Sequence, residues 1–293
     1  YWNIRNKEYI RLARRQLNQS ISTAAAQIVL AIPKLKLGGR GLIFGSFIGQ
    51  FIATSVLLKQ TGKKNWIEIK RNVNIQSLYN VLRKYRKFPL YDSWPSLLDN
   101  LTLAMPVMFF TYFYGADESG QLALTFKILA IPSALIGASV AQVYYQRMAA
   151  ARNENIKLSS IVEPTFVGLF GIGICFCLMV VFFAPSLFTI IFGSMWGTSG
   201  KFARIIAPAL ALRFIVSPLS GAFLVLNRLE FIAMWKALAA ACTAISFLIS
   251  CTYFNDPNIS IIFLLINDLI IYSLYLALIF RITGSSLVRS FTY

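Results

Sequence analysis

Charged side chains inside apolar segments are the residues of this sequence that could do chemistry. Arg213 lies between Pro208 and Pro218 in one apolar run, and Asp268 lies in the middle of another. An arginine at the centre of a bilayer costs at least about 2.5 kcal/mol, so such groups face a wet cavity or a charged partner and mark substrate and ion pathways. We therefore interpret Arg213 and Asp268 either as cavity residues or as a structural ion pair with each other.

Lys127, Asp99 and Asn100 are further candidates for the same cavity. Lys127 shares a helical face with a stripe of mostly small residues: Ala134, Ala138, Ala141 and Tyr145. That stripe either lines the cavity or packs on a neighbouring helix while the Lys127 ammonium extends outward. Asp99 and Asn100 lie one turn inside the start of their segment, where the helix dipole alone would stabilise a carboxylate.

The composition excludes a soluble protein and much of hydrolytic chemistry. Hydrophobic residues make up 57% of the chain and charged residues 13%, whereas soluble domains are about 45–50% apolar and about 25% charged. The chain contains no histidine, which excludes His-based zinc sites and Ser-His-Asp triads. It also has no G-x-x-x-x-G-K-[ST] nucleotide loop. We expect an integral membrane protein that is not an enzyme, with no catalytic, metal or cofactor site.

The elements that must position these side chains are membrane-spanning helices. A bilayer core requires about 20 mostly apolar residues per helix, and eight segments qualify: 16–36, 41–58, 95–114, 121–146, 161–183, 201–226, 235–253 and 260–280. If both ends of the chain are cytoplasmic, most of its 28 Lys and Arg residues fall on the cytoplasmic side, as expected for a membrane protein. Because these cations lie between apolar runs, we expect no nucleic-acid partner.

Small residues and prolines shape the predicted helices. Gly41, Gly45 and Gly49 lie at four-residue spacing, which favours close helix packing in a membrane. Prolines inside the segments are candidate hinges, because each removes a backbone hydrogen bond and bends its helix, either as a static kink or as a moving joint. These candidate hinges are Pro106, Pro132, Pro208 and Pro218.

A long basic stretch, 59–94, divides two predicted helices from six. Near its end lies a cluster of four cations, called here the basic cluster: Arg83, Lys84, Arg86 and Lys87. Anionic lipid at the inner membrane surface is a sufficient partner for this cluster. The alternative is that it attracts a phosphorylated lipid headgroup toward the cavity.

Several motifs along the chain resemble one family. The run YRKFPLYDSWPSLLDNLTLAMPV at 85–107 is similar to the polysaccharide biosynthesis, or oligosaccharide (O-antigen type) flippase, proteins of the multidrug/oligosaccharidyl-lipid/polysaccharide exporter superfamily. Further similar runs are GLIFG at 41–45, AIPSALIGASVAQV at 130–143, FGSMW at 192–196 and SPLS at 217–220.

This resemblance implies an all-α architecture of two six-helix lobes joined by a cytoplasmic linker. Residues 1–58 would be the last two helices of the first lobe, 59–94 the linker and 95–293 the complete second lobe. About four helices would then precede the chain. This agrees with a sequence that starts at Tyr1 rather than Met, so we expect the C-terminal part of a longer protein.

The resemblance also implies a function. Such proteins move a polyprenyl-diphosphate-linked oligosaccharide across the bacterial cytoplasmic (inner) membrane by alternating access, for surface polysaccharides such as lipopolysaccharide. The expected partners are this lipid, membrane lipid and other polysaccharide-assembly membrane proteins. Two alternatives stay open: an exporter of small amphipathic compounds, and an integral membrane polymerase or transferase. The second has little support, because the predicted outer loops carry only Asp117, Glu118 and Asp256 as acidic residues.

Replacing the four cations of the basic cluster with Gln is expected to weaken binding of the anionic donor lipid. The loss should be larger at low salt than at high salt, because salt screens exposed charges. Binding to nanodiscs that contain the lipid, measured across a salt series, checks this. A loss that does not depend on salt, or no loss at all, would contradict recruitment by charge.

Overall fold

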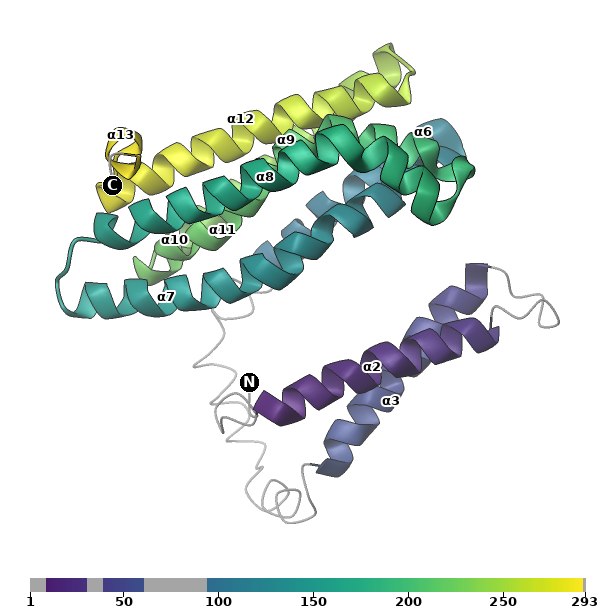
Figure 1. Cartoon of the computed structure of the whole chain (residues 1–293), viewed down its shortest axis with the longest axis horizontal. Coiled ribbons are helices and arrows are strands. Elements are labelled where there is room, and N and C mark those ends of the chain that lie inside the picture. Colours follow the sequence, from purple (N-terminus) through teal and green to yellow (C-terminus); the bar gives the residue numbers. More distant parts are fainter. Residues whose placement is uncertain (1–8, 31–38, 61–93, 292–293) are drawn as a thin grey trace. The chain divides into compact units, whose positions relative to one another are not determined.

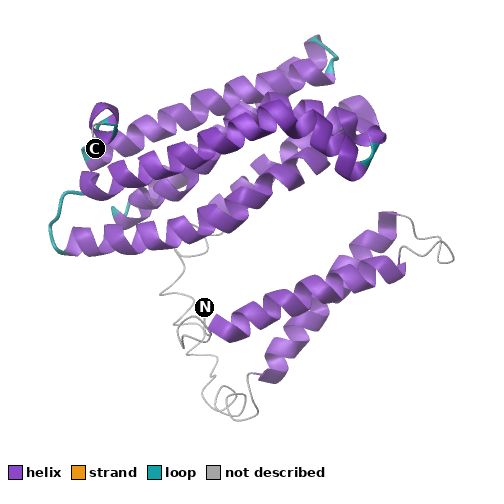
Figure 2. Ribbon diagram, viewed as in Figure 1, coloured by secondary structure: helices purple, strands orange, loops and turns teal. Residues whose placement is uncertain are grey.

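The structure of the chain is a computed structural model that describes residues 9–30, 39–60 and 94–291. Every regular element in these described ranges is helical, and none is a strand (Figure 2). The chain divides into two units, Tyr1–Lys84 and Tyr85–Tyr293, which are described separately. The expectation of an all-α membrane protein is confirmed, whereas the lobe boundaries stay a prediction.

The first unit contains a pair of packed helices, α2 (Tyr9–Leu30) and α3 (Gly39–Gln60). The glycines of α3 lie against α2: a Cβ atom added to Gly41 would lie 2.8 Å from the Leu30 carbonyl oxygen, and one added to Gly45 would lie 2.9 Å from the Gln27 Cα. The amide of Gln27 also donates to Ser46 Oγ at 3.0 Å. The glycine spacing therefore serves helix packing, as predicted.

The second unit is a bundle of long helices joined by short turns (Figure 1). Its long helices are α6 (Trp94–Pro132), α7 (Ala138–Asn153), α8 (Ser159–Phe192), α9 (Gly197–Leu219), α11 (Leu229–Tyr253) and α12 (Pro257–Thr283). Short elements lie between or after them: the π-helical turn η3 (Ser133–Gly137), the 3₁₀ turn η4 (Ser194–Trp196), α10 (Gly221–Val225) and α13 (Leu287–Ser290).

Five stretches of the described chain are long and apolar enough to cross a membrane: Leu97–Asn153, Ser159–Phe192, Ser194–Val225, Leu229–Tyr253 and Pro257–Thr283. The sequence predicted six here, because the first stretch contains two of its segments, 95–114 and 121–146. Gly115 interrupts α6 with φ 88° and ψ −178°. Leu103 and Ala130 line one cavity, although a straight helix would separate them by about 40 Å. The chain therefore reverses at Gly115.

Helix α9 lies at the centre of the second unit. In the stretch Ser194–Val225, 56% of the apolar window is buried inside the protein, against 17–28% in the other four stretches. Two clusters of buried apolar side chains lie along it, one around Phe202 and Ile206 and one around Ile215 and Leu219. Because Arg213 is on this helix, its backbone is placed among the other helices rather than beside lipid.

Helices α8 and α9 approach each other closely at two points. A Cβ atom added to Gly200 would lie 2.6 Å from Pro185 Cα, and one added to Gly173 would lie 3.1 Å from the Ile215 side chain. No larger side chain fits at Gly200, since its nearest neighbours are backbone atoms. Gly168 and Gly171, by contrast, have nothing within 4 Å, so of the three α8 glycines only Gly173 closely approaches α9.

A polar network joins the second half of α6 to the start of α9. The amide N–H of Ser199 donates to Gln121 Oε1 at 3.0 Å, and Thr125 Oγ1 donates to the Ser199 carbonyl at 2.9 Å. Gln121 Nε2 also donates to the Met195 carbonyl at 2.7 Å. Because hydrogen bonds have no competition from water inside a membrane protein, this network holds the two helices together.

The four prolines that the sequence marked as candidate hinges all lie within helices. Pro106 and Pro132 lie within α6, and Pro208 and Pro218 lie within α9. The π-helical turn η3 directly follows Pro132. Such turns occur frequently at functional sites. Whether any of the four prolines acts as a hinge stays a prediction.

Gly200→Ala is expected to destabilise the protein by about 1–3 kcal/mol, because the added methyl group overlaps the α8 backbone. Gly171→Ala is the matched control: it places the same methyl group on α8 in open space. Thermal unfolding in detergent measures both. Equal unfolding temperatures for the two variants would contradict the close α8–α9 contact.

Candidate functional site

Two adjoining cavities lie between helices α6, α9, α11 and α12. The first has a volume of about 420 Å³ and the second about 500 Å³, which is the range of small-molecule sites. They share several wall residues: Thr102, Leu103, Arg213, Ser217, Ala239, Ile271 and Tyr272. We treat them as two compartments of one site.

Arg213 lies at the junction of the two compartments. Its guanidinium carbon is 5.5 Å from the centre of the Tyr272 ring, a cation–π distance. Among the described residues, no carboxylate lies within ion-pair distance of Arg213. The structure thus places a permanent positive charge in a cavity, with no direct counter-ion from the described part of the chain.

Asp268 lines the first compartment and is 8% exposed. Its Oδ1 accepts a hydrogen bond from Asn267 Nδ2 at 3.3 Å, and the same Nδ2 donates to Thr243 Oγ1 at 3.2 Å. The direct ion pair with Arg213, one of the two alternatives from the sequence, does not form. Asp268 instead accepts a hydrogen bond from one neutral donor, the Asn267 amide, and lines the same cavity as Arg213.

Lys127 lines the first compartment together with Arg213, Asp268 and Pro106. Two residues of the stripe below it, Ala134 and Ala138, are exposed. The stripe therefore does not pack there on a neighbouring helix of this unit. Lys127 is itself exposed, and it also lines the first compartment.

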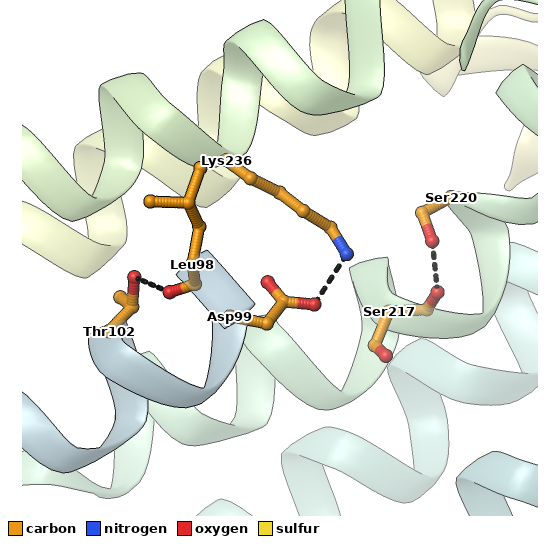
Figure 3. A network of polar contacts seen from close by, with 6 residues as sticks. All are labelled: Leu98, Asp99, Thr102, Ser217, Ser220 and Lys236. Atoms are coloured by element: carbon orange, nitrogen blue, oxygen red, sulfur yellow. Dashed lines mark hydrogen bonds and ion pairs between the residues drawn. The ribbon is translucent and has the colours of Figure 1, made fainter. Parts of the chain in front are cut away.

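Asp99 lines the second compartment, where it forms an ion pair with Lys236 of α11 (Figure 3). Lys236 lies at the start of the predicted segment 235–253, where nothing in the sequence distinguished it from an interfacial lysine. The structure places it within α11, facing Asp99. Asn100 is not among the residues that line either compartment.

The remaining site predictions lie elsewhere. Pro132, Pro208 and Pro218 are not among the wall residues of either compartment. The basic cluster, Arg83, Lys84, Arg86 and Lys87, lies outside the described residues.

The second compartment has aromatic and hydroxyl walls. Tyr275 stacks on Trp235 with ring centroids 5.1 Å apart and on Phe223 at 5.2 Å. Trp235, Tyr275 and the hydroxyl residues Ser217 and Ser220 line this compartment. Ser220 Oγ donates to the Ser217 carbonyl at 2.6 Å (Figure 3). These walls offer flat apolar faces beside hydrogen-bonding groups, which suits an amphipathic ligand.

The charges of the site favour an anion. Among its described wall residues, Arg213, Lys127 and Lys236 are cations, and Asp99 and Asp268 are carboxylates. The three cations exceed the two carboxylates by one charge, and electrostatic attraction is strengthened at those walls from which water is excluded. Within the described residues no group of three His, Cys, Asp or Glu side chains could hold a metal ion.

Comparison with known families decides the general role of the chain. A sequence model described as polysaccharide biosynthesis protein matches residues 3–200, more than half of the chain. The chain belongs to the polysaccharide biosynthesis protein family. This polysaccharide biosynthesis protein matched no curated protein and no solved structure. The family match includes Asp99 and Lys127 but ends before Arg213, whose place in the site rests on the structure.

The site is expected to be open to water-soluble reagents. Ser217→Cys, introduced after the native cysteines are replaced, should react with a small charged thiol reagent, since Ser217 is exposed and lines both compartments. Ile215→Cys is the matched control, because Ile215 lies on the same helix and is 4% exposed. Mass spectrometry after timed labelling measures both rates. Equal labelling of the two positions would contradict a wet cavity beside Arg213.

Proposed function

We propose that this polysaccharide biosynthesis protein translocates a polyprenyl-diphosphate-linked oligosaccharide across the bacterial cytoplasmic membrane. The observation that carries the proposal is Arg213, a cation on the central helix that lines both compartments and has no carboxylate within ion-pair distance among the described residues. Family membership supports a role in polysaccharide assembly, and the multiple apolar helices support work within a membrane.

The proposed substrate class explains why a cation is needed in the site. A diphosphate carries negative charge that cannot enter hydrocarbon without a compensating group. A guanidinium is suited to the task because it is always charged and binds phosphate oxygens through two parallel hydrogen bonds. Lys127, in the same compartment, would add a second positive charge. The aromatic and hydroxyl walls of the second compartment would lie beside the sugars.

Alternating access is the mechanism that fits a cavity within a helix bundle. In this proposal the site opens to one membrane face and then to the other, while the polyprenyl tail stays in lipid. The basic cluster would recruit the headgroup from the cytoplasmic side, and Pro106, which lines the first compartment, is the hinge candidate nearest to the site. No chemical bond changes in this cycle.

An exporter of small amphipathic compounds would use the same architecture, and a polymerase or transferase would need catalytic groups. A cell phenotype separates the first reading from translocation of a lipid-linked oligosaccharide: drug sensitivity on loss of the gene indicates an exporter. Lost surface polysaccharide with lipid-linked intermediate retained on the inner leaflet indicates translocation. Product formation in detergent, where no compartments exist, would indicate an enzyme.

Arg213→Gln in the native gene is expected to reduce translocation by about 10- to 100-fold, the range for losing a hydrogen-bonded charge. Accessibility of the lipid-linked oligosaccharide to an enzyme on the outer face of vesicles measures it. Arg204→Gln is the matched control, because Arg204 is an exposed residue of the same helix outside both compartments. Normal translocation by Arg213→Gln at normal protein level would remove Arg213 from the mechanism.

A further inference from the structure

The ion pair between Lys236 and Asp99 lies in the wall of the second compartment. It joins the first turns of α6 to α11, two segments that are 137 residues apart in the chain. The side chain of Lys236 is 29% exposed and that of Asp99 is 51% exposed. Both partners are therefore partly accessible, and the pair lies at an open edge of the cavity rather than in the core.

From this arrangement we propose that Lys236 is an anion-binding residue whose ammonium exchanges between Asp99 and a diphosphate ester bound at Arg213, the cation that lines both compartments. The inference rests on the proposed function for the identity of the anion. Asp99 then acts as a competitor of the ligand: it occupies Lys236 while the cavity is empty and is released when the diphosphate enters.

The weakness of the pair is what allows the exchange. Ion pairs between half-exposed side chains contribute little free energy, because water and salt screen them. A diphosphate carries more negative charge than one carboxylate, so it attracts the ammonium more strongly. A lysine suits this exchange better than an arginine, because its ammonium is a compact charge on a flexible stem and does not require a fixed planar partner.

Arg213 and Lys236 then have different tasks in one compartment. Arg213 has the Tyr272 ring as its partner and no carboxylate at ion-pair distance among the described residues, so it is available to an anion from the start. Lys236 becomes available only when Asp99 gives it up. Because the Asp99 carboxylate competes with the ligand for Lys236, it lowers the affinity of the site for the ligand. This lower affinity favours release of the ligand after translocation.

A double-mutant cycle on the purified protein in nanodiscs tests the exchange, with farnesyl diphosphate and inorganic pyrophosphate as separate probes. Lys236→Gln should raise the Kd of the probe, and Lys236→Arg should largely restore binding. Asp99→Asn should lower the Kd by about threefold, which lies within the range of about 1.4- to 5-fold for a weak ion pair. In the Lys236→Gln background, Asp99→Asn should change Kd by no more than about twofold, the usual limit of additivity.

Matched controls are Asp117→Asn and Lys201→Gln, since both residues are exposed and neither is a wall residue of the two compartments. Neither control should change Kd. Gel filtration establishes that each variant is folded, and a tighter Kd for Asp99→Asn cannot arise from misfolding.

Several results would overturn the exchange. The first is weaker binding by Asp99→Asn, which would make Asp99 a positioning residue for Lys236. The second is equal tightening with and without Lys236, which would reduce Asp99 to a source of repulsion. The third is no binding of either probe by the unaltered protein, which would remove the proposed function as well.

Other results separate the inference from the proposed function. Binding that is lost in Arg213→Gln but unchanged in Asp99→Asn would keep the diphosphate site and reject the exchange. A cycle seen with farnesyl diphosphate supports a lipid headgroup as the natural anion. A cycle seen only with pyrophosphate would support the exchange of Lys236 and overturn the lipid substrate.

Discussion

The free energy needed to place a guanidinium in hydrocarbon constrains the whole second unit. Arg213 can exist at its position only if other helices or water surround it. The structure meets this condition by putting α9 at the centre of the bundle, where more than half of its apolar window is buried. The neighbouring helices α6, α11 and α12 then supply the cavity walls, and Tyr272 supplies an aromatic face for the charge. The need to surround this charge with protein or water thus accounts for the presence of a cavity around Arg213.

The two compartments handle charge in different ways. In the first, Asp268 is buried and accepts a hydrogen bond from the Asn267 amide, and it lines the same compartment as Arg213 without forming an ion pair with it. In the second, Asp99 and Lys236 form an ion pair at the accessible edge of the cavity. If every cation in a membrane site formed a strong ion pair within the protein, none would be available to bind an anion. Here, Arg213 is available to an anion in the cavity, and Lys236 forms a weak ion pair with Asp99.

Sequence patterns predicted the helices well because each crossing needs a long apolar run, whatever its neighbours are. They also selected Arg213, Lys127 and Asp268, because a charge within such a run stands out. They missed Lys236, since a lysine near the start of a segment has the same local pattern as an interfacial lysine. Its pairing with Asp99 depends on the packing of α6 against α11, which no local pattern contains. The same limit left the Arg213–Asp268 ion pair as an open alternative that only the arrangement of helices could decide.

The close packing at Gly200 and Gly173 also has a mechanical meaning. Helices α8 and α9 touch through backbone and rigid side chains, and the hydrogen bonds of Gln121, Thr125 and Ser199 attach the second half of α6 to α9. These three segments form a frame with few internal degrees of freedom, and both Arg213 and Lys127 belong to it. Asp99 and Lys236 lie on segments outside this frame, the first half of α6 and α11. A change in cavity shape that keeps these contacts intact would move the ion pair relative to Arg213 and Lys127.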